Sequence, residues 1–145
     1  MTATNRATVQ RLFNDAINKH DLSVLWELCA DDCTYHLPLV GELRGEALRQ
    51  FVASLIAAFP DAQRTVEDLL SDDIHKVVTR WTFTGSHQGH FMGIAPTGKR
   101  VAFTGISIHT IHSGKLVEEW QEWDSLGLMQ QLGVVPTFKF EATAA

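Results

Sequence analysis

Two predicted strands near the end of the chain carry side chains that could exchange protons with a ligand. Residues 100–111 and 115–124 alternate apolar and polar residues with the period of two that is typical of strands. His109 lies on the first strand and Glu119 on the second. Histidine is the side chain whose charge changes nearest to neutral pH. A histidine beside a glutamate in a half-enclosed pocket could therefore act as a general acid and base.

The turn between the two strands sets which residues face each other. Residues 112–115 read His-Ser-Gly-Lys. A two-residue type I′ turn would need a positive φ at Ser113, so we expect a three-residue loop with Gly114 in the left-handed conformation. This register predicts the following pairs: Ile111 with Lys115, His109 with Val117, Ser107 with Glu119 and Gly105 with Gln121.

The strand period then divides the side chains between two faces of a sheet. One face would carry the polar candidates with aromatic neighbours: Phe103, Ser107, His109, Glu119, Gln121 and Trp123. The opposite face would carry Ile106, Ile108, Leu116, Glu118, Trp120, Glu122 and Asp124. A monomer rarely leaves so much apolar surface in water, so we expect the second face to be covered in a homodimer.

Several short motifs follow one another in a fixed order between residues 85 and 133. They are Gly85-Ser86-His87-Gln88-Gly89, Ala95-Pro96-Thr97-Gly98-Lys99, Gly114-Lys115-Leu116-Val117-Glu118, the segment from Trp120 to Asp124, and Gln130-Gln131-Leu132-Gly133. With these motifs the chain resembles the SnoaL-like polyketide cyclases, also named ester cyclases, of the nuclear transport factor two-like superfamily. The resemblance covers nearly the whole chain.

The resemblance implies a fold and a chemistry. The fold would be α+β: a cone-shaped, curved antiparallel sheet packed on three N-terminal helices, with a pocket between sheet and helices. The chemistry would be an intramolecular aldol closure of an aromatic polyketide ester, with no metal and no nucleotide. Members of the superfamily usually pair through the outer face of the sheet.

The resemblance also implies catalytic positions, and this chain departs from them. The cyclases carry a W-D-x-x-D pattern on the last strand, in which the first aspartate is the acid/base and a histidine lies beside it. Here Gln121 occupies the first aspartate position, Asp124 the second and Ser107 the histidine position. Because a glutamine amide does not titrate, we expect His109 and Glu119 to carry the protons, while Ser107 and Gln121 orient ligand oxygens. Asp124 is either a third acid/base or the N-cap of the next helix.

Five further residues are candidates for contact with a ligand, each with a structural alternative. His36 matches a strand position where the family often has a histidine at the pocket mouth. Arg80 could hold a carboxylate or an enolate oxygen, or form an ion pair. His87 lies in a glycine-rich segment that would pass over the pocket rim, or would only shape that loop. Phe91 and Trp123 are apolar wall candidates or plain core.

The remaining elements must place these residues. We expect helices over residues 4–19, after an N-cap at Asp21, and between Gly45 and Pro60. Further strands are expected at Thr34 to Leu39, 62–71 and 75–84, and a final helix at 125–132 before Gly133. Helices followed by a strand meander indicate an α+β domain over residues 1–136, with residues 137–145 as a tail.

Composition narrows the classes of partner. The chain has 145 residues, 45% of them apolar, and a net charge of −5 without a basic cluster, which argues against nucleic acid and anionic membranes as partners. The first residues are polar and no apolar run has the length of a membrane span, so we expect a cytoplasmic protein with Cys29 and Cys33 reduced. Cys29, Cys33 and His36 lack the fourth ligand of a zinc site, so neither a metal nor a cofactor is expected.

Three hypotheses follow for function. The first is a cofactor-independent acid/base enzyme, of the isomerase or lyase class, acting on a small, largely apolar carbonyl compound by cyclisation, isomerisation, dehydration or hydrolysis. The second is a non-catalytic module that binds an apolar or aromatic carbonyl ligand. The third is an oligomeric scaffold. A titratable pair facing a cavity would favour the first, a cavity with only neutral polar groups the second, and a filled pocket the third.

Overall fold

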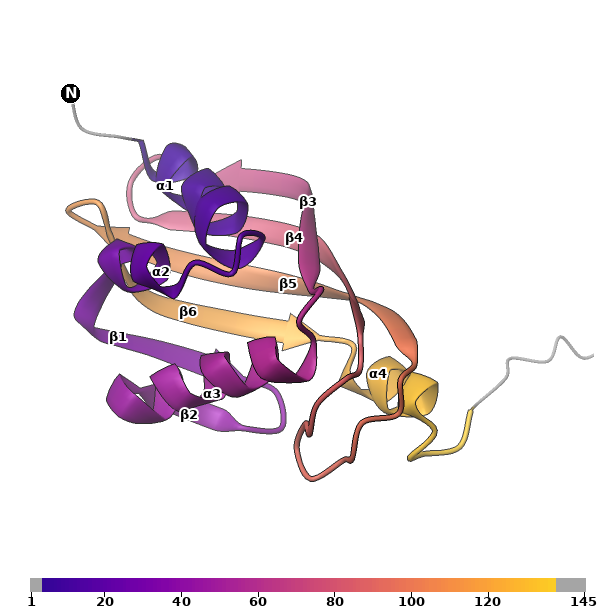
Figure 1. Ribbon diagram of the computed structural model, residues 1–145. Coiled ribbons are helices and arrows are strands. Elements are labelled where there is room, and N and C mark those ends of the chain that lie inside the picture. Colours follow the sequence, from indigo (N-terminus) through magenta and orange to yellow (C-terminus); the bar gives the residue numbers. More distant parts are fainter. Residues whose placement is uncertain (1–3, 138–145) are drawn as a thin grey trace, which may run out of the picture.

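The computed structural model describes residues 4–137 and has a sheet curved around a layer of helices (Figure 1). The elements in chain order are α1 (Asn5–Arg11), the π-helical turn η1 (Leu12–Ile17), α2 (Leu22–Leu28), β1 (Cys29–Leu37), β2 (Gly41–Arg44), α3 (Gly45–Ala58), β3 (Gln63–Ser71), β4 (Lys76–Ser86), β5 (Arg100–His112), β6 (Lys115–Trp123) and α4 (Ser125–Leu132). The tail was expected at residues 137–145, and all of it except residue 137 lies outside the described residues.

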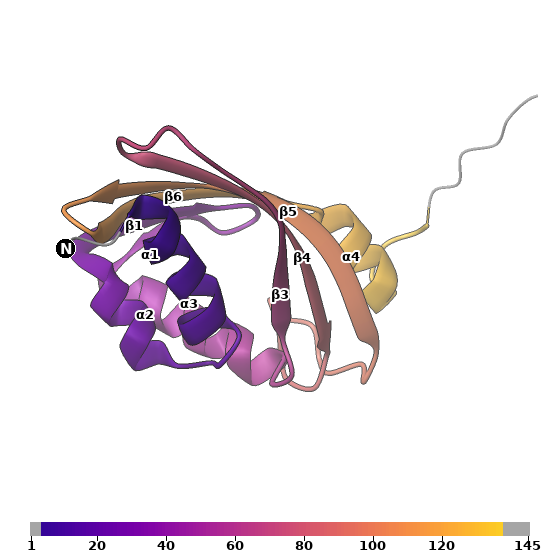
Figure 2. The same ribbon diagram turned by 90° about the horizontal axis from the view of Figure 1, so that it is seen from above.

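The sheet has six strands in the order β2-β1-β6-β5-β4-β3. The α+β class, the curved sheet and the three helical segments before β3 are confirmed. The sheet is mixed rather than wholly antiparallel, because β1 runs parallel to β6. It is also an open sheet, with β2 and β3 at its edges. Figure 2 shows the sheet curling over α1, α2 and α3, with α4 on the other side of the curved end.

Local signals explain the helices. Thr4 and Asp21 cap α1 and α2 by accepting backbone N–H groups with their side chains. The helix expected at 4–19 begins as predicted, and its second part widens into η1. One side of this helix packs its apolar residues against the sheet, and the buried ones are Val9, Leu12, Phe13 and Ala16. None of the helices among residues 4–137 is long and apolar enough to cross a membrane.

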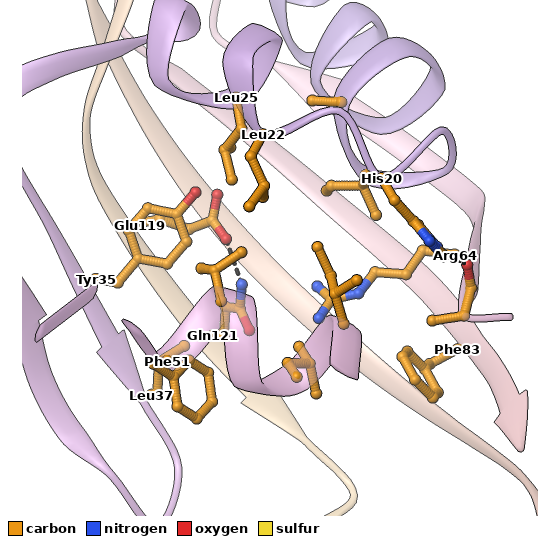
Figure 3. A pocket seen from close by; sticks show the side chains of 16 residues that line it. His20, Leu22, Leu25, Tyr35, Leu37, Phe51, Arg64, Phe83, Glu119 and Gln121 are labelled. Atoms are coloured by element: carbon orange, nitrogen blue, oxygen red, sulfur yellow. Dashed lines mark hydrogen bonds between the residues drawn. The ribbon is translucent and has the colours of Figure 1, made fainter. Parts of the chain in front are cut away.

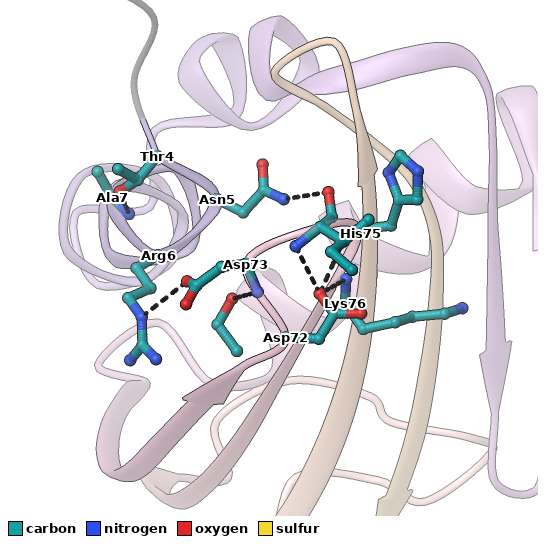
Figure 4. Close-up of polar contacts among 10 residues, drawn as sticks. Thr4, Asn5, Arg6, Ala7, Asp72, Asp73, His75 and Lys76 are labelled. Atoms are coloured by element: carbon teal, nitrogen blue, oxygen red, sulfur yellow. Dashed lines mark hydrogen bonds and ion pairs between the residues drawn. The ribbon is translucent and has the colours of Figure 1, made fainter.

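The N-terminal helix is attached to the turn between β3 and β4 by polar contacts (Figure 4). Asn5 Nδ2 donates to the carbonyl of Ile74 at 3.0 Å, and Arg6 Nε lies 3.3 Å from an Asp73 oxygen. The carboxylate of Asp72 accepts backbone N–H groups within the same turn. These contacts hold α1 over the inner face of β3 and β4.

The first strand differs from the sequence prediction. It begins at Cys29 instead of Thr34, so both cysteines lie on β1, where they are buried free thiols. The short strand β2 was not predicted, and it pairs with β1 after a turn in which Leu39 and Gly41 have positive φ. Positive φ at a leucine is rare, which is why the sequence did not indicate this hairpin.

The predicted register between β5 and β6 is wrong in detail. The strands are joined by a two-residue turn in which Ser113 has φ 50° and Gly114 φ 76°, so the strain at Ser113 did not exclude it. A bulge then leaves Val117 without a partner. The resulting pairs are His112 with Lys115, Ile111 with Leu116, His109 with Glu119, Ser107 with Gln121 and Gly105 with Trp123.

The shorter turn and the bulge each change the register by one residue. Beyond the bulge, the pairing of β5 with β6 is therefore shifted by two residues from the predicted pairing. A shift of two keeps every side chain on its predicted face, because side chains alternate with a period of two. The polar candidates therefore stay on the inner face. Leu116, which precedes the bulge, is the exception: it was expected outside and is buried in the core at 2% exposure.

Gly105 shows how closely the inner face is packed. A Cβ at this position would overlap the indole of Trp81 and lie 2.9 Å from the Cβ of Trp123. Trp81 is fully buried and donates from Nε1 to Ser107 Oγ at 2.9 Å. The Trp81 ring therefore occupies the space that a side chain at position 105 would need.

We expect Gly105→Ala to destabilise the fold by about 1–3 kcal/mol, because the added methyl group overpacks the core. Urea unfolding followed by tryptophan fluorescence measures the change. Thr104→Ala, an exposed neighbour on the same strand, is the matched control and should unfold near the wild-type midpoint. Equal midpoints for the two variants would contradict the role given to Gly105.

Candidate functional site

A cavity lies between the inner face of the sheet and the helices (Figure 3). Its lining is mostly apolar and comprises Ala16, Ile17, His20, Leu22, Leu25, Tyr35, Leu37, Phe51, Val52, Leu55, Ile56, Ala62, Arg64, Phe83, Glu119 and Gln121. Its volume of about 90 Å³ is several times the ~10–15 Å³ that one water molecule needs. The pocket is therefore open to a ligand and not filled by side chains.

Glu119 is the polar centre of this cavity. Its Oε1 accepts a hydrogen bond from His109 Nδ1 at 2.6 Å. Its Oε2 accepts one from the amide nitrogen of Gln121. On the other side of the imidazole, His109 Nε2 lies 2.9 Å from the hydroxyl of Thr79. An ionised carboxylate can only accept hydrogen bonds. The proton between His109 and Glu119 is therefore assigned to Nδ1 of the imidazole.

The surroundings of Glu119 favour its ionised form. Burial alone would raise its pKa, because the side chain is only 3% exposed. The charge and hydrogen bond of His109, the Gln121 amide and the charge of Arg64 outweigh burial and hold the pKa of Glu119 below its usual value. Glu119 is thus a carboxylate at neutral pH, and its lowered pKa makes it a weaker base than an ordinary glutamate.

His109 stands behind Glu119 and does not line the cavity. It is 1% exposed, and the edge of its ring meets Phe13 at a centroid distance of 5.9 Å. A ligand in the cavity therefore meets the carboxylate of Glu119 and not the imidazole. The imidazole can orient and charge-balance the carboxylate, as carboxylate–histidine pairs commonly do.

Three polar residues of the cavity were missed by the sequence analysis. One is His20, whose Nε2 lies 2.7 Å from the carbonyl oxygen of Ala62. Arg64, on β3, lines the cavity with its guanidinium stacked 4.3 Å from the ring centroid of Trp81. Tyr35, on β1, lines it as well, and burial followed by the charge of Glu119 raises the pKa of its phenol well above the usual value. Tyr35 is therefore a neutral hydroxyl. The strand period at residues 63–66 was the available signal for Arg64, since it places Arg64 and Val66 on one face.

Other expected ligand contacts lie away from the cavity. His36 is on the outer face, stacked on Trp120 at 3.7 Å and bonded to Glu118 at 3.0 Å. Arg80, also on the outer face, forms an exposed ion pair with Asp68 at 2.7 Å. The structure does not bring His36 or Arg80 to the cavity.

The remaining candidates have structural contacts. Asp124 is exposed and caps α4 by accepting from the N–H of Gly127 at 2.9 Å. Ser107 is buried beneath Trp81, and Trp123 packs against Phe103 at 5.5 Å.

The glycine-rich segment places two more candidates outside the cavity. His87 is fully buried in the loop that precedes β5, where its Nδ1 accepts from the N–H of Thr97 at 3.1 Å. Phe91, in the same loop, packs on Phe59 at 5.5 Å. Among residues 4–137, no three His, Cys, Asp or Glu side chains are grouped so that they could hold a metal ion.

Comparison with protein-family models identifies one family. The model of the SnoaL-like polyketide cyclases matches residues 7–132. No curated protein matches the chain.

Solved structures with a similar fold come from several Streptomyces proteins. IdmH from Streptomyces antibioticus, described as a candidate polyketide cyclase, is 31% identical with a TM-score of 0.76 over 89% of this chain and 98% of its own. TsrD from Streptomyces laurentii is 32% identical with a TM-score of 0.78 over 92% and 100%. AclR from Streptomyces galilaeus, described as a candidate hydroxylase, is 28% identical with a TM-score of 0.82 over 92% and 87%.

The depressed pKa of Glu119 predicts how stability depends on pH. The ionised carboxylate contributes stability that is complete above the ordinary glutamate value of 4.5 and is lost as the pH falls through the lower folded value. We therefore expect the free energy of unfolding to fall more steeply in the wild type than in Glu119→Gln below about pH 5. Urea titrations at about pH 7, 5 and 3 measure both. Glu122→Gln, on the exposed face of β6, should follow the wild type; parallel curves for all three proteins would refute the prediction.

Proposed function

Because the chain belongs to the SnoaL-like polyketide cyclase family, we propose that it is a cofactor-independent enzyme acting on a small, largely apolar, polyketide-like carbonyl compound. The reaction begins when a base removes the proton next to the carbonyl group. The resulting enolate can close a ring, shift a double bond or expel a leaving group. Proton removal is the step common to these outcomes, and it is the step that the cavity is equipped to perform.

The observation that supports the proposal most directly is an ionised carboxylate at the wall of an apolar cavity. Glu119 touches the cavity, and its partners His109 and Gln121 keep it ionised. It is the residue we assign as the general base. A carboxylate of low pKa is a weak base, so it suits a substrate whose C–H bond is already made acidic by neighbouring carbonyl groups.

The other polar groups have supporting roles. His109 is a positioning residue that orients Glu119 through the 2.6 Å hydrogen bond to its Oε1. The Tyr35 hydroxyl and the free amide N–H of Gln121 face the same cavity and can donate to the ligand's carbonyl oxygen, where negative charge develops.

The proposal also accounts for Gln121 at the family's aspartate position. Glu119 lies two residues earlier on the same strand and on the same face, which displaces the carboxylate by about 7 Å along the strand. The displaced carboxylate keeps a histidine directly opposite it, because His109 pairs with Glu119 across the strands. The acid/base group is thus moved within the cavity rather than lost.

We expect Glu119→Gln to lower the rate of proton exchange by about 10²–10⁴-fold, the usual contribution of a general base. The measurement is deuterium incorporation next to the carbonyl of aromatic 1,3-dicarbonyl esters in D₂O, followed by NMR. Glu118→Gln is the matched control, because Glu118 also pairs with a histidine, but on the outer face. His109→Gln should lower the rate less and shift its pH profile.

The result also separates the two main hypotheses for function. If the wild type binds these aromatic 1,3-dicarbonyl esters but exchanges no proton in any of them, the cavity is a binding site without catalysis. If Glu119→Gln retains the wild-type rate, another group is the base.

We further propose a homodimer formed through the outer face of the sheet. Ile106, Ile108 and Trp120 are 49%, 40% and 50% exposed there, which is much apolar surface on neighbouring strands.

We expect Trp120→Glu to convert a dimer into a monomer in sedimentation velocity, because a charge would be buried unpaired at the interface. Leu70→Glu, at a leucine that is 67% exposed on the edge strand β3, is the control. A wild-type monomer at about 100 times the assay concentration would refute the dimer.

A further inference from the structure

We propose that Arg64 is the receptor for a carboxylate of the ligand, so that the cavity takes small aromatic or alicyclic oxo acids in preference to their neutral analogues. This inference deepens the proposed function and rests on it for the identity of the cavity as the substrate site. It is carried by the position of one arginine whose hydrogen-bonding capacity the protein does not use.

The guanidinium of Arg64 enters the cavity from β3 (Figure 3). Within residues 4–137, its side chain donates no hydrogen bond and forms no ion pair; only its backbone N–H and carbonyl bond, both to the side chain of Asn18. Its five N–H groups are therefore available to a ligand or to water. By contrast Arg80, on the outer face, pairs with Asp68.

The carboxylate of Glu119 does not take up these donors. Its two oxygens are occupied by His109 and Gln121. Burial lowers the pKa of Arg64, and the charge of Glu119 only partly opposes this effect. Arg64 is half-buried, and a cation that loses water without gaining hydrogen-bond partners is costly, so a ligand anion would lower that cost.

Arginine in this setting selects a planar oxyanion. The guanidinium presents parallel N–H groups that match the two oxygens of a carboxylate. The rings of Trp81 and Phe83, at 4.3 and 5.9 Å from the guanidinium carbon, hold the group in place from one side. The rest of the lining is apolar and suits a ring system.

The charges also orient the ligand. Glu119 would repel a carboxylate placed beside it, so the acid group of the ligand lies at Arg64. The carbonyl and its acidic C–H then lie toward Glu119, Tyr35 and Gln121. One cavity would thus bind the ligand at one end and remove the proton at the other.

Calorimetric titration of the full chain with 2-naphthoate and with 2-naphthamide tests the proposal without any turnover. The two compounds have the same ring system and differ in charge. We expect the acid to bind the wild type at least about ten-fold more tightly than the amide, as is typical of a charged hydrogen bond. Arg64→Met should reduce this ratio to about one, and Arg64→Lys should keep part of it. Arg80→Met, the outer-face control, should keep it all.

The outcomes are distinguishable from those of the proposed function. The role of Arg64 is overturned if the acid and the amide bind equally well, if neither binds, or if the preference for the acid survives Arg64→Met. If that happens while neutral esters still exchange protons through Glu119, the proposed function stands alone. If the preference depends on Arg64 but no compound exchanges a proton, the ligand class stands and the catalytic function fails.

Discussion

An ionised carboxylate buried in an apolar interior is the constraint on which the inner face of this protein depends. Transferring such a charge from water is expensive, and it is tolerated only where hydrogen bonds and opposite charge replace the lost hydration. His109 and Gln121 occupy both oxygens of Glu119, and Thr79 in turn bonds the far side of the imidazole. Three neighbouring strands, β4, β5 and β6, therefore have to be in register for one side chain to remain charged.

A second histidine–glutamate pair lies on the opposite face of the sheet, between β1 and β6. His36 and Glu118 lie 3.0 Å apart, yet Glu118 is 39% exposed in its side chain and Glu119 only 4%. The residue types are identical, so the difference in environment decides what each pair can do. The outer pair is solvated and lies beside Trp120, whereas Glu119 of the inner pair lines a cavity that a ligand can enter.

The family relationship establishes the fold, and the side chains of the cavity decide the chemistry. Similar structures carry different descriptions, one as a candidate polyketide cyclase and one as a candidate hydroxylase. One scaffold can host several reactions, because the residues of the cavity change while the packing of sheet and helices is kept. In this chain Glu119, Tyr35, Arg64 and Gln121 line the cavity, and we propose that its specificity depends on them.

Much of the architecture followed from the sequence by itself. Period-two alternation at 100–111 and 115–124 placed His109, Glu119 and Gln121 on one face, because the side a strand residue faces is a local property. Capping residues such as Asp21 marked helix starts correctly for the same reason.

Tertiary structure decided what local signals could not. The Ser113 turn and the Val117 bulge depend on the pairing of whole strands, which outweighs the strain at one residue. The cavity depends on how the sheet curves and on which helices cover it. The curvature of the sheet and the position of the helices place Arg64 and Tyr35 in the cavity lining and His109 behind Glu119. They leave His36 and Arg80 outside the cavity. Local sequence signals cannot predict these placements, because they depend on contacts between elements that are far apart in the chain.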